Sequence, residues 1–306
     1  MTIMDCRPFL AVGVSFLAAV LISFSRRYPN VRESWSVIAS FIKFGLIISM
    51  VPGVLAGVTY EWTLFQITDT IGFTLRADSA GILFACLAAL LWIPINFYSI
   101  GYMRCNNEHE QTGYFAAFAI CMSSVMGIAM ASNLLTFFFF YELLTIASYP
   151  LVLHKRNEEA LLASRKYLIY TLISGQLFLA GLVAVYCISG TMDFKAGGFL
   201  TTDMAPTWQL QLIFLIMILA GSVKAAVMPL HGWLPAAMIA PTPVSALLHA
   251  VAVVKTGVFA VLRIIGFVFG PKLLADIGTA DILAWFAAGS IIISSLIAIQ
   301  QDNLKR

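Results

Sequence analysis

The sequence has few charged residues for its length. Only 11% of its 306 residues are Asp, Glu, Lys or Arg, whereas 60% are hydrophobic. A soluble globular domain has about 25% charged residues, so this composition excludes an ordinary soluble domain. It indicates an all-α, polytopic membrane protein. The formal net charge of +3 is also too small to indicate nucleic-acid binding.

Motifs that hold cofactors or perform catalysis are also missing. The sequence contains no Gly-rich phosphate loop, nucleophile elbow, HExxH or haem-ligand signature. Its cysteines show no CxxC or Cys/His spacing typical of zinc or iron–sulfur sites, so we interpret them as small apolar residues. These cysteines are Cys6, Cys86, Cys105, Cys121 and Cys187. We therefore expect no metal, no cofactor and no catalytic centre in this chain.

Long apolar runs dominate the chain. A helix needs about 20 residues to cross a bilayer, and the runs predict about nine crossings. They lie at residues 9–24, 37–58, 79–102, two within 114–153, 163–188, 210–228, 244–269 and 282–299. The first run has no basic leader beyond Arg7 and no clean cleavage site, so we expect a retained helix and not a signal peptide.

Two connections carry local signals. Residues 59–77 alternate polar and apolar side chains, which predicts a short extramembrane hairpin. Residues 114–153 are too long for one helix, and Ser132 with Asn133 predicts the turn and the cap of the second helix.

The distribution of basic residues predicts the orientation. Cytoplasmic loops carry the excess of Lys and Arg, and ten basic residues would lie on one side against five on the other. The richer side holds Arg26, Arg27, Arg32, Arg104, Lys155, Arg156, Arg165, Lys166, Lys305 and Arg306, and the poorer side Arg7, Arg76, Lys195, Arg263 and Lys272. The N-terminus is therefore predicted outside and the C-terminus in the cytoplasm of a prokaryote.

One acid lies deep in a predicted crossing. Glu142 follows the Asn133 cap by nine residues, which places it about 13 Å into the membrane, and Thr145 and Tyr149 continue its helical face. Ionisable residues at such depth are expensive and usually mark an ion pathway. The alternative is that Glu142 only joins two helices by a hydrogen bond; we favour the pathway, because Ser, Asn or Gln would serve that purpose at lower cost.

Basic residues and prolines interrupt the apolar sequence between residues 221 and 263. Residues 209–240 are too long for one straight crossing, and Pro229 with Pro235 predicts a broken helix, with Lys224 just before the break and His231 just after it. Pro243 predicts the first turn of the next helix, which would carry His249 and Lys255 on different faces. The remaining lysine of a crossing, Lys43, is expected to reach the nearby cytoplasmic interface by snorkelling.

These residue types permit proton transfer. Burial favours the neutral form of a lysine, and a nearby carboxylate favours its charged form, so a change in their separation can load or release a proton. Histidines and water could carry that proton between lysines. We therefore predict a proton relay of Glu142, Lys224, His231, His249 and Lys255.

Three segments also carry a resemblance to a known family. Residues 140–151, 221–263 and 75–103 resemble the proton-conducting antiporter-like subunits of respiratory complex I, membrane-bound hydrogenases and Mrp-type cation/proton antiporters. The resemblance implies about fourteen helices in two inverted repeats, each with a broken helix and half of a proton path. It also implies roles for Glu142 at the inter-subunit end, Lys224 on the broken helix, and Lys255 with His249 as the link toward the second half. His231 matches the histidine after the break.

The resemblance divides the chain into three parts. Residues 1–113 would hold three helices and the hairpin, 114–269 the proton-path repeat with a break around 229, and 270–306 a ninth helix and a tail. The chain would thus be the first inverted-repeat half, with most of the second repeat missing. We expect a split subunit whose partner chain supplies the rest, and a fragment is the alternative.

Several functions agree with this resemblance. The first is a proton-translocating subunit of a redox-driven complex such as complex I or a hydrogenase, which would make the chain a pumping subunit of an oxidoreductase without a catalytic centre of its own. Alternatives are a membrane partner of an inorganic-carbon uptake system, a purely structural scaffold, and one component of a Mrp-type Na⁺/H⁺ antiporter. The partners implied are other membrane subunits, lipid, protons and, for the antiporter, Na⁺.

Overall fold

The structure is a computed structural model that describes residues 2–68 and 71–302, apart from the side chains of residues 248–250. Within the described residues, eight helices are long and apolar enough to cross a membrane. They are α1 (Arg7–Phe24), α2 (Pro29–Leu55), α3 (Ser79–Cys105), α4 (Gln111–Ala129), α5 (Leu134–Val152), α6 (Glu158–Ser189), the span Thr207–Ala237 that begins with α7 (Thr207–Ala225), and α12 (Ala280–Ile299). The expectation of a helical, multi-pass membrane protein is confirmed.

The crossing expected at residues 244–269 is interrupted. It consists of α9 (Thr242–Ala250), α10 (Val253–Arg263) and the π-helical turn η2 (Ile264–Phe269), followed by α11 (Pro271–Asp276). Val251 and Ala252 leave the helical conformation, with ψ angles of −48° and −91° at φ angles of −133° and −91°. β-Branched residues such as Val251, Val253 and Val254 weaken a helix by losing side-chain freedom, but neither proline nor glycine marks this break in the sequence.

The hairpin expected at residues 59–77 is present. β2 (Thr59–Thr68) pairs antiparallel with β3 (Ile71–Ala77), and β1 (Thr2–Met4) adds a parallel strand beside β2. The Arg76 guanidinium of β3 donates to the carbonyl oxygens of Ser132 and Phe194 at 3.2 and 2.8 Å. The sheet is therefore fixed to the α4–α5 turn and to the α6–α7 connection.

The predicted turn between α4 and α5 also forms. Asn133 caps α5, because its side chain accepts a hydrogen bond from the Thr136 backbone N–H at 2.8 Å. The cap satisfies one of the N–H groups that a helix start leaves unpaired. It also defines where α5, which carries Glu142, enters the bundle.

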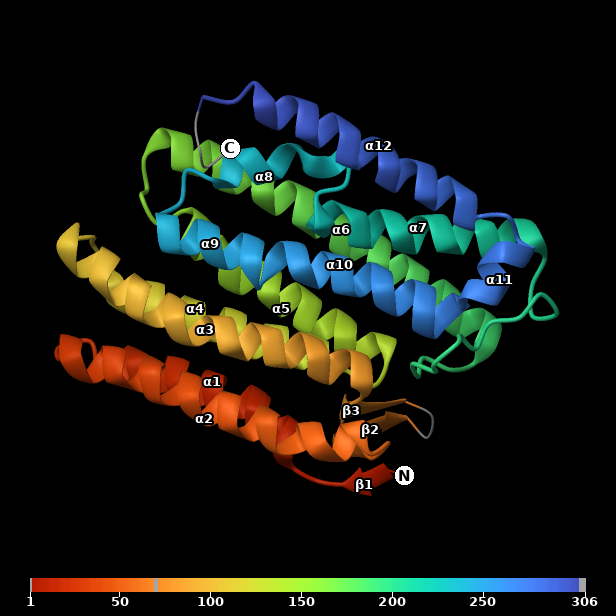
Figure 1. Cartoon of the computed structure of the whole chain (residues 1–306), viewed down its shortest axis with the longest axis horizontal. Helices are drawn as coiled ribbons and strands as arrows, with labels where there is room; N and C mark the ends of the chain where they lie inside the picture. Colours follow the sequence, from red (N-terminus) through yellow and green to blue (C-terminus); the bar gives the residue numbers. More distant parts are fainter. Residues whose placement is uncertain (1, 69–70, 303–306) are drawn as a thin grey trace.

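The long helices run roughly along one direction (Figure 1). α4 is buried along most of its length and packs against α1 and α5, while α7 packs against α6 and α10. α12 lies on the outside, and none of its residues is buried. β1 and the end of α12 lie at opposite ends of the bundle.

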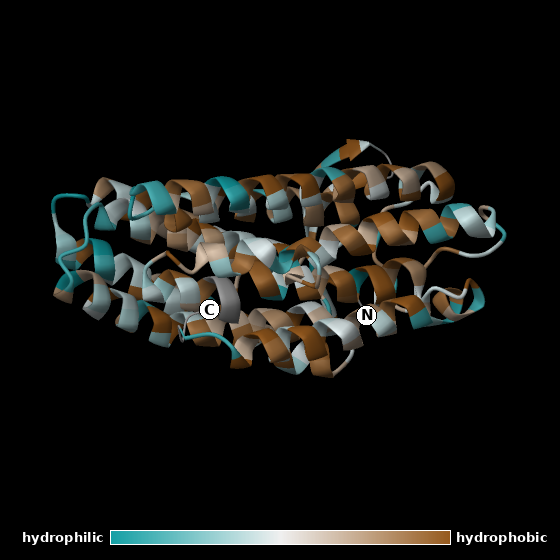
Figure 2. Ribbon diagram, turned by 90° about the horizontal axis from the view of Figure 1, so that it is seen from above, coloured by the Kyte–Doolittle hydropathy of each residue, from teal (hydrophilic) through white to brown (hydrophobic). Residues whose placement is uncertain are grey.

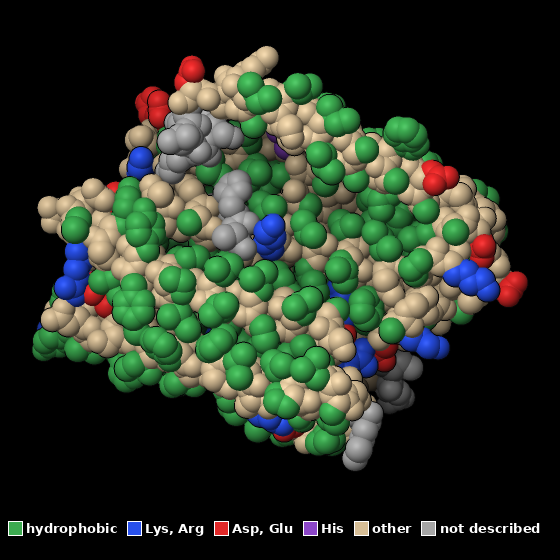
Figure 3. Space-filling model, viewed as in Figure 1, with side chains coloured by type: hydrophobic (Ala, Val, Ile, Leu, Met, Phe, Trp, Pro, Cys, Tyr) green, Lys and Arg blue, Asp and Glu red, His purple; other side chains and the backbone are tan. Residues whose placement is uncertain are grey.

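Polar and apolar residues are sorted as a membrane requires. The hydrophilic connections gather at the two ends of the bundle, and the helices between them are mostly hydrophobic (Figure 2). The face in Figure 3 is covered largely by apolar side chains, with charged ones mainly toward its rim. Such a surface suits contact with lipid tails, because the tails cannot form hydrogen bonds with polar groups.

Candidate functional site

The broken helix forms at the predicted position. α7 ends at Ala225, and Ala226 takes the left-handed conformation with φ of 57°. The chain continues through the 3-10 turn η1 (Leu230–Gly232) into α8 (Trp233–Ala237). The Trp233 indole N–H donates to the Val223 carbonyl oxygen at 2.7 Å, which satisfies a carbonyl near the helix end. Lys224 thus lies in the last turn of α7, directly before the break.

Lys224 is fully buried in contact with Tyr141 of α5. Its Nζ donates to the Tyr141 carbonyl oxygen at 2.5 Å and lies 3.3 Å from the centroid of the Tyr141 ring. A ring face attracts a cation through its negative electrostatic potential, most strongly where water is excluded. The charged form of Lys224 therefore has two stabilising contacts from a single residue.

Glu142 is the next residue after Tyr141 and is partly buried. Its carboxylate packs against Gly175 of α6, where an added Cβ would lie 2.2 Å from Oε1. Glu142 Oε1 is buried and has no hydrogen-bond partner among the described residues. No direct ion pair joins Glu142 to Lys224 in the described part of the chain, but Lys224 Nζ donates to the carbonyl oxygen of Tyr141, the residue before Glu142. The two side chains are thus held on adjoining helices without direct contact.

Buried hydroxyl groups extend the polar region along α5 and α6. Tyr141 Oη and Ser174 Oγ lie 3.0 Å apart, and both donate to the Ala220 carbonyl oxygen. Further along α5, Ser148 Oγ lies 2.6 Å from the Tyr167 hydroxyl. Sequence reasoning missed these groups, because isolated Ser and Tyr residues in apolar helices carry no signal that separates a polar path from ordinary packing.

α10 approaches α7 closely beside Lys224. A Cβ added to Gly257 would lie 2.2 Å from the Ala225 nitrogen and 2.6 Å from the Lys224 carbonyl carbon. Lys255 precedes this contact by two residues and is exposed. Val258 and Leu262 continue its exposed face at about helical spacing. The structure therefore places the α10 backbone beside Lys224, with the Lys255 side chain on an outer face.

His231 makes no contact with Lys224 or Glu142 among the described residues. His231 is in η1, and its Nδ1 is buried without a hydrogen-bond partner among the described residues. It lines a cavity together with Trp285 and Ser290 of α12. His249 lies in α9, but its side chain is outside the described residues. Among the described side chains of the predicted relay, Lys224 and Glu142 lie on adjoining helices and are linked through Tyr141, whose carbonyl oxygen accepts from Lys224 Nζ.

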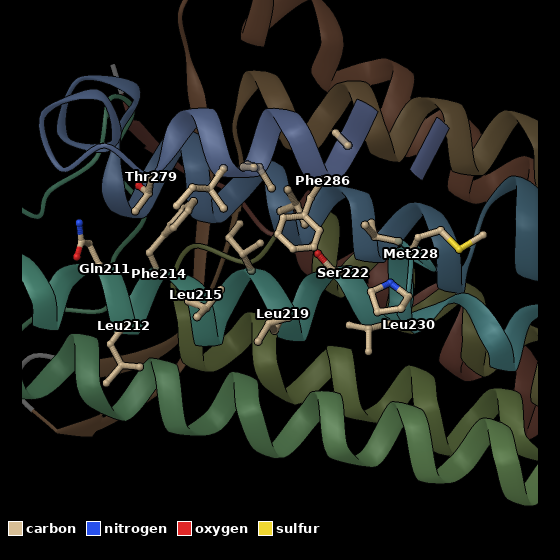
Figure 4. Close-up of a pocket in the computed structure, with 17 residues that line it drawn as sticks. Gln211, Leu212, Phe214, Leu215, Leu219, Ser222, Met228, Leu230, Thr279 and Phe286 are labelled. Atoms are coloured by element: carbon tan, nitrogen blue, oxygen red, sulfur yellow. The ribbon is translucent and has the colours of Figure 1, made fainter. Parts of the chain in front are cut away.

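A larger cavity of about 490 Å³ separates α7 from α12 (Figure 4). Phe214 from α7 and Phe286 from α12 project into the space between these helices. None of the residues that line it is charged, and its few polar members include Gln211 and Ser222. Such a lining suits an acyl chain or another apolar side chain and offers no group for proton transfer.

The prediction that Lys43 snorkels is wrong. Lys43 lies in the middle of α2 and is fully buried. Its Nζ donates to the Met122 carbonyl oxygen of α4 at 3.0 Å and lies 4.2 Å from the centroid of the Trp92 ring of α3. The lysine faces the neighbouring helices and not the interface, because this face of α2 packs against α3 and α4.

The predicted orientation treats Arg263 as a loop residue, and the structure corrects this. Arg263 is 1% exposed, at the end of α10, and its guanidinium binds the Asp78 carboxylate with distances of 2.5 and 2.9 Å. Asp78 also caps α3. A buried, doubly hydrogen-bonded pair of this kind joins α10 to α3, so Arg263 does not act as a free loop charge.

These features define the class: a multi-pass helical membrane protein with a buried lysine at a helix break and an acid on the adjoining helix. Residues 131–306 match the family described as "NADH:quinone oxidoreductase/Mrp antiporter, TM". The chain belongs to this family.

Curated relatives and solved structures agree with this assignment. The chain is 29% identical to a Na(+)/H(+) antiporter subunit of Alkalihalophilus pseudofirmus over 95% of its length and 36% of the relative's. It is 30% identical to NAD(P)H-quinone oxidoreductase chain 5 of a Picosynechococcus species over 87% of its length and 40% of the relative's. The chain therefore spans well under half of the length of these relatives.

The fold agrees with that of a Mrp complex from a Dietzia species, with a TM-score of 0.84 at 22% identity over 97% of this chain and 32% of that one. It also agrees with an archaeal membrane-bound sulfane sulfur reductase, with a TM-score of 0.76 at 21% identity over 85% of this chain and 53% of that one. Both are structures of complexes.

Proposed function

We propose that this chain forms part of a proton conduit in a multisubunit membrane complex. The relay would consist of Glu142, Lys224, His231, His249 and Lys255. The observation that carries the proposal is Lys224, which is fully buried at a helix break and donates to the carbonyl oxygen of Tyr141, the residue before Glu142. Buried ionisable groups in membrane helices are costly, and they usually mark a pathway for ions.

The geometry supports a switch between two states of Lys224. The charged form is stabilised by the Tyr141 carbonyl oxygen, the Tyr141 ring and the negative charge of Glu142. Protonation or displacement of Glu142 would remove the last of these contributions and favour release of the lysine proton. Glu142 Oε1 has no hydrogen-bond partner among the described residues, so the carboxylate is free to accept a proton or a water molecule.

The exposed side of α10 supports contact with further helices. Lys255 lies between apolar neighbours on a face where Val258 is 50% and Leu262 46% exposed. A lysine in such a stripe would be costly against lipid, whereas a neighbouring helix with a polar group would satisfy it. We propose that this face continues the proton path from Lys224 into the adjoining helices of the assembly.

For the cellular setting, we propose the cytoplasmic membrane of a prokaryote, with the N-terminus outside and the last helix ending in the cytoplasm. The energy source would be redox chemistry in other subunits. Exchange of Na⁺ for H⁺ is the second candidate, because the relatives include components of Na(+)/H(+) antiporters together with a quinone oxidoreductase chain.

Mass spectrometry of the complex purified from its native membrane in mild detergent tests the assembly. The proposal expects a second antiporter-like chain or segment together with redox subunits. Small hydrophobic subunits without redox partners would favour the Na⁺/H⁺ antiporter, and purification of this chain without any partner would contradict the proposal.

A further inference from the structure

Two connections at one end of the bundle bring three ligand-type side chains together. Glu108 and His109 lie between α3 and α4, and His154 follows α5. One ligand atom from each residue lies within 4.8 Å of the other two. His154 Nε2 is 3.6 Å from Glu108 Oε2, and the His109 and His154 rings stack with centroids 4.9 Å apart.

His154 is the buried member of this cluster. It is 7% exposed, and its Nε2 has no hydrogen-bond partner among the described residues. A buried polar atom without a partner is costly, and native proteins usually satisfy such an atom. Its ring also meets the Tyr114 ring edge-on, with centroids 5.7 Å apart and planes 74° apart. Packing therefore holds the imidazole with Nε2 toward the Glu108 carboxylate.

Hydrogen bonds hold the loop that supplies Glu108 and His109 in place. The Gln111 side chain donates to the carbonyl oxygens of Met103 and Glu108 at 3.1 and 3.2 Å, and the Glu108 N–H donates to the Met103 carbonyl oxygen. The neighbouring Arg156 is already paired, because it binds Glu110 at 2.6 Å. Glu108 therefore has its carboxylate available for the two imidazoles.

We propose that Glu108, His109 and His154 form a binding site for a divalent transition-metal ion of the zinc type. Two imidazoles and one carboxylate are a common ligand set for Zn²⁺, with water in the remaining position. Ligand atoms in a tetrahedral zinc site lie about 3.3 Å apart; His154 Nε2 and Glu108 Oε2 lie 3.6 Å apart, and one ligand atom from each of the three residues lies within 4.8 Å of the others. The stacked, exposed His109 ring would turn its nitrogen toward the ion.

The ion would fasten the α3–α4 connection to the end of α5. α5 carries Tyr141 and Glu142, so this site would fix one end of the helix that contacts Lys224. It rests on groups that the proposed proton relay does not use, and its test is independent of transport.

Zinc binding to the purified full chain, without a histidine tag and in detergent micelles, tests the proposal. Zn²⁺ alone is added to metal-free protein and followed by calorimetry, with Co²⁺ absorption as a second readout of ligand type. We expect about one ion per chain. Affinity should fall at least roughly tenfold in His109→Ala and in Glu108→Gln, because even changes to outer-shell partners cost about 10- to 100-fold.

Glu110→Gln is the matched control, since this acid neighbours the cluster but binds Arg156. It should bind zinc like the wild type. Zinc should also raise the melting temperature of the wild type and of Glu110→Gln, but not of His109→Ala. Wild-type binding no tighter than that of His109→Ala, or an equal loss in Glu110→Gln, would overturn the proposed site.

Discussion

Lys224 and Tyr141 contact each other twice, through the backbone carbonyl and through the ring. Lys224 Nζ lies 2.5 Å from the Tyr141 carbonyl oxygen and 3.3 Å from the ring centroid. The carbonyl contact does not depend on the side chain at position 141, but the ring contact does. Substitutions at Tyr141 therefore separate the two contributions.

Tyr141→Leu should reduce proton transport more than Tyr141→Phe. A desolvated cation–ring contact contributes about 2 kcal/mol, so its loss should lower transport on the order of tenfold. Phe keeps the ring and removes only the hydroxyl, which binds Ser174 and Ala220. Proton uptake by vesicles that contain the assembled complex is the measurement. Equal losses of proton transport in both variants would contradict a contribution of the Tyr141 ring.

Gly175→Ala should impair transport by displacing the Glu142 carboxylate. The added Cβ would lie 2.2 Å from Glu142 Oε1, so the side chain must move away from α6. Gly45→Ala is the matched control, because nothing lies within 4 Å of a Cβ at that position. The same vesicle measurement should show a loss for Gly175→Ala alone. Wild-type transport in Gly175→Ala would contradict the assigned position of Glu142.

Lys43→Met should leave the protein as stable as the wild type or make it more stable. Met fills nearly the same volume and removes the cost of burying a cation that has one carbonyl and one ring as partners. Lys43→Ala should instead lose roughly 2–5 kcal/mol, because it leaves a cavity. Melting temperatures in detergent compare the two variants. A large loss in Lys43→Met would mean that the lysine charge itself supports the fold.

The predicted orientation can be tested with natural cysteines. Cys6 and Cys105 are both exposed and lie before α1 and at the end of α3, at opposite ends of the bundle. A membrane-impermeant thiol reagent applied to intact cells should label Cys6 and leave Cys105 unlabelled. Loss of labelling in Cys6→Ser or in Cys105→Ser identifies which cysteine reacts. Labelling of Cys105 alone would show that the orientation is the reverse of the predicted one.

The cap of α5 and the break after α7, which position the proposed relay, could be predicted from the sequence because both depend on local signals. Asn133 caps α5, and α7 breaks after Lys224 near Pro229, both as expected from residue chemistry. The break between α9 and α10 escaped prediction, because no proline or glycine marks Val251 and Ala252.

Other features depend on packing that the sequence does not display. Lys43 has a buried environment only because α3 and α4 cover that face of α2. The three metal-ligand candidates, Glu108, His109 and His154, come from two separate connections, so no short spacing motif reveals them.

Lys224→Met is the decisive variant for the proposed proton relay. Met is unbranched and one atom shorter than Lys, and it cannot carry a proton; Lys272→Met provides the control, because Lys272 is exposed on α11. Proton uptake is measured in vesicles that contain the complex, with its assembly verified by mass spectrometry. We expect that Lys224→Met assembles but loses most of its transport, while Lys272→Met transports normally. Wild-type transport by an assembled Lys224→Met complex would contradict a proton relay through this residue.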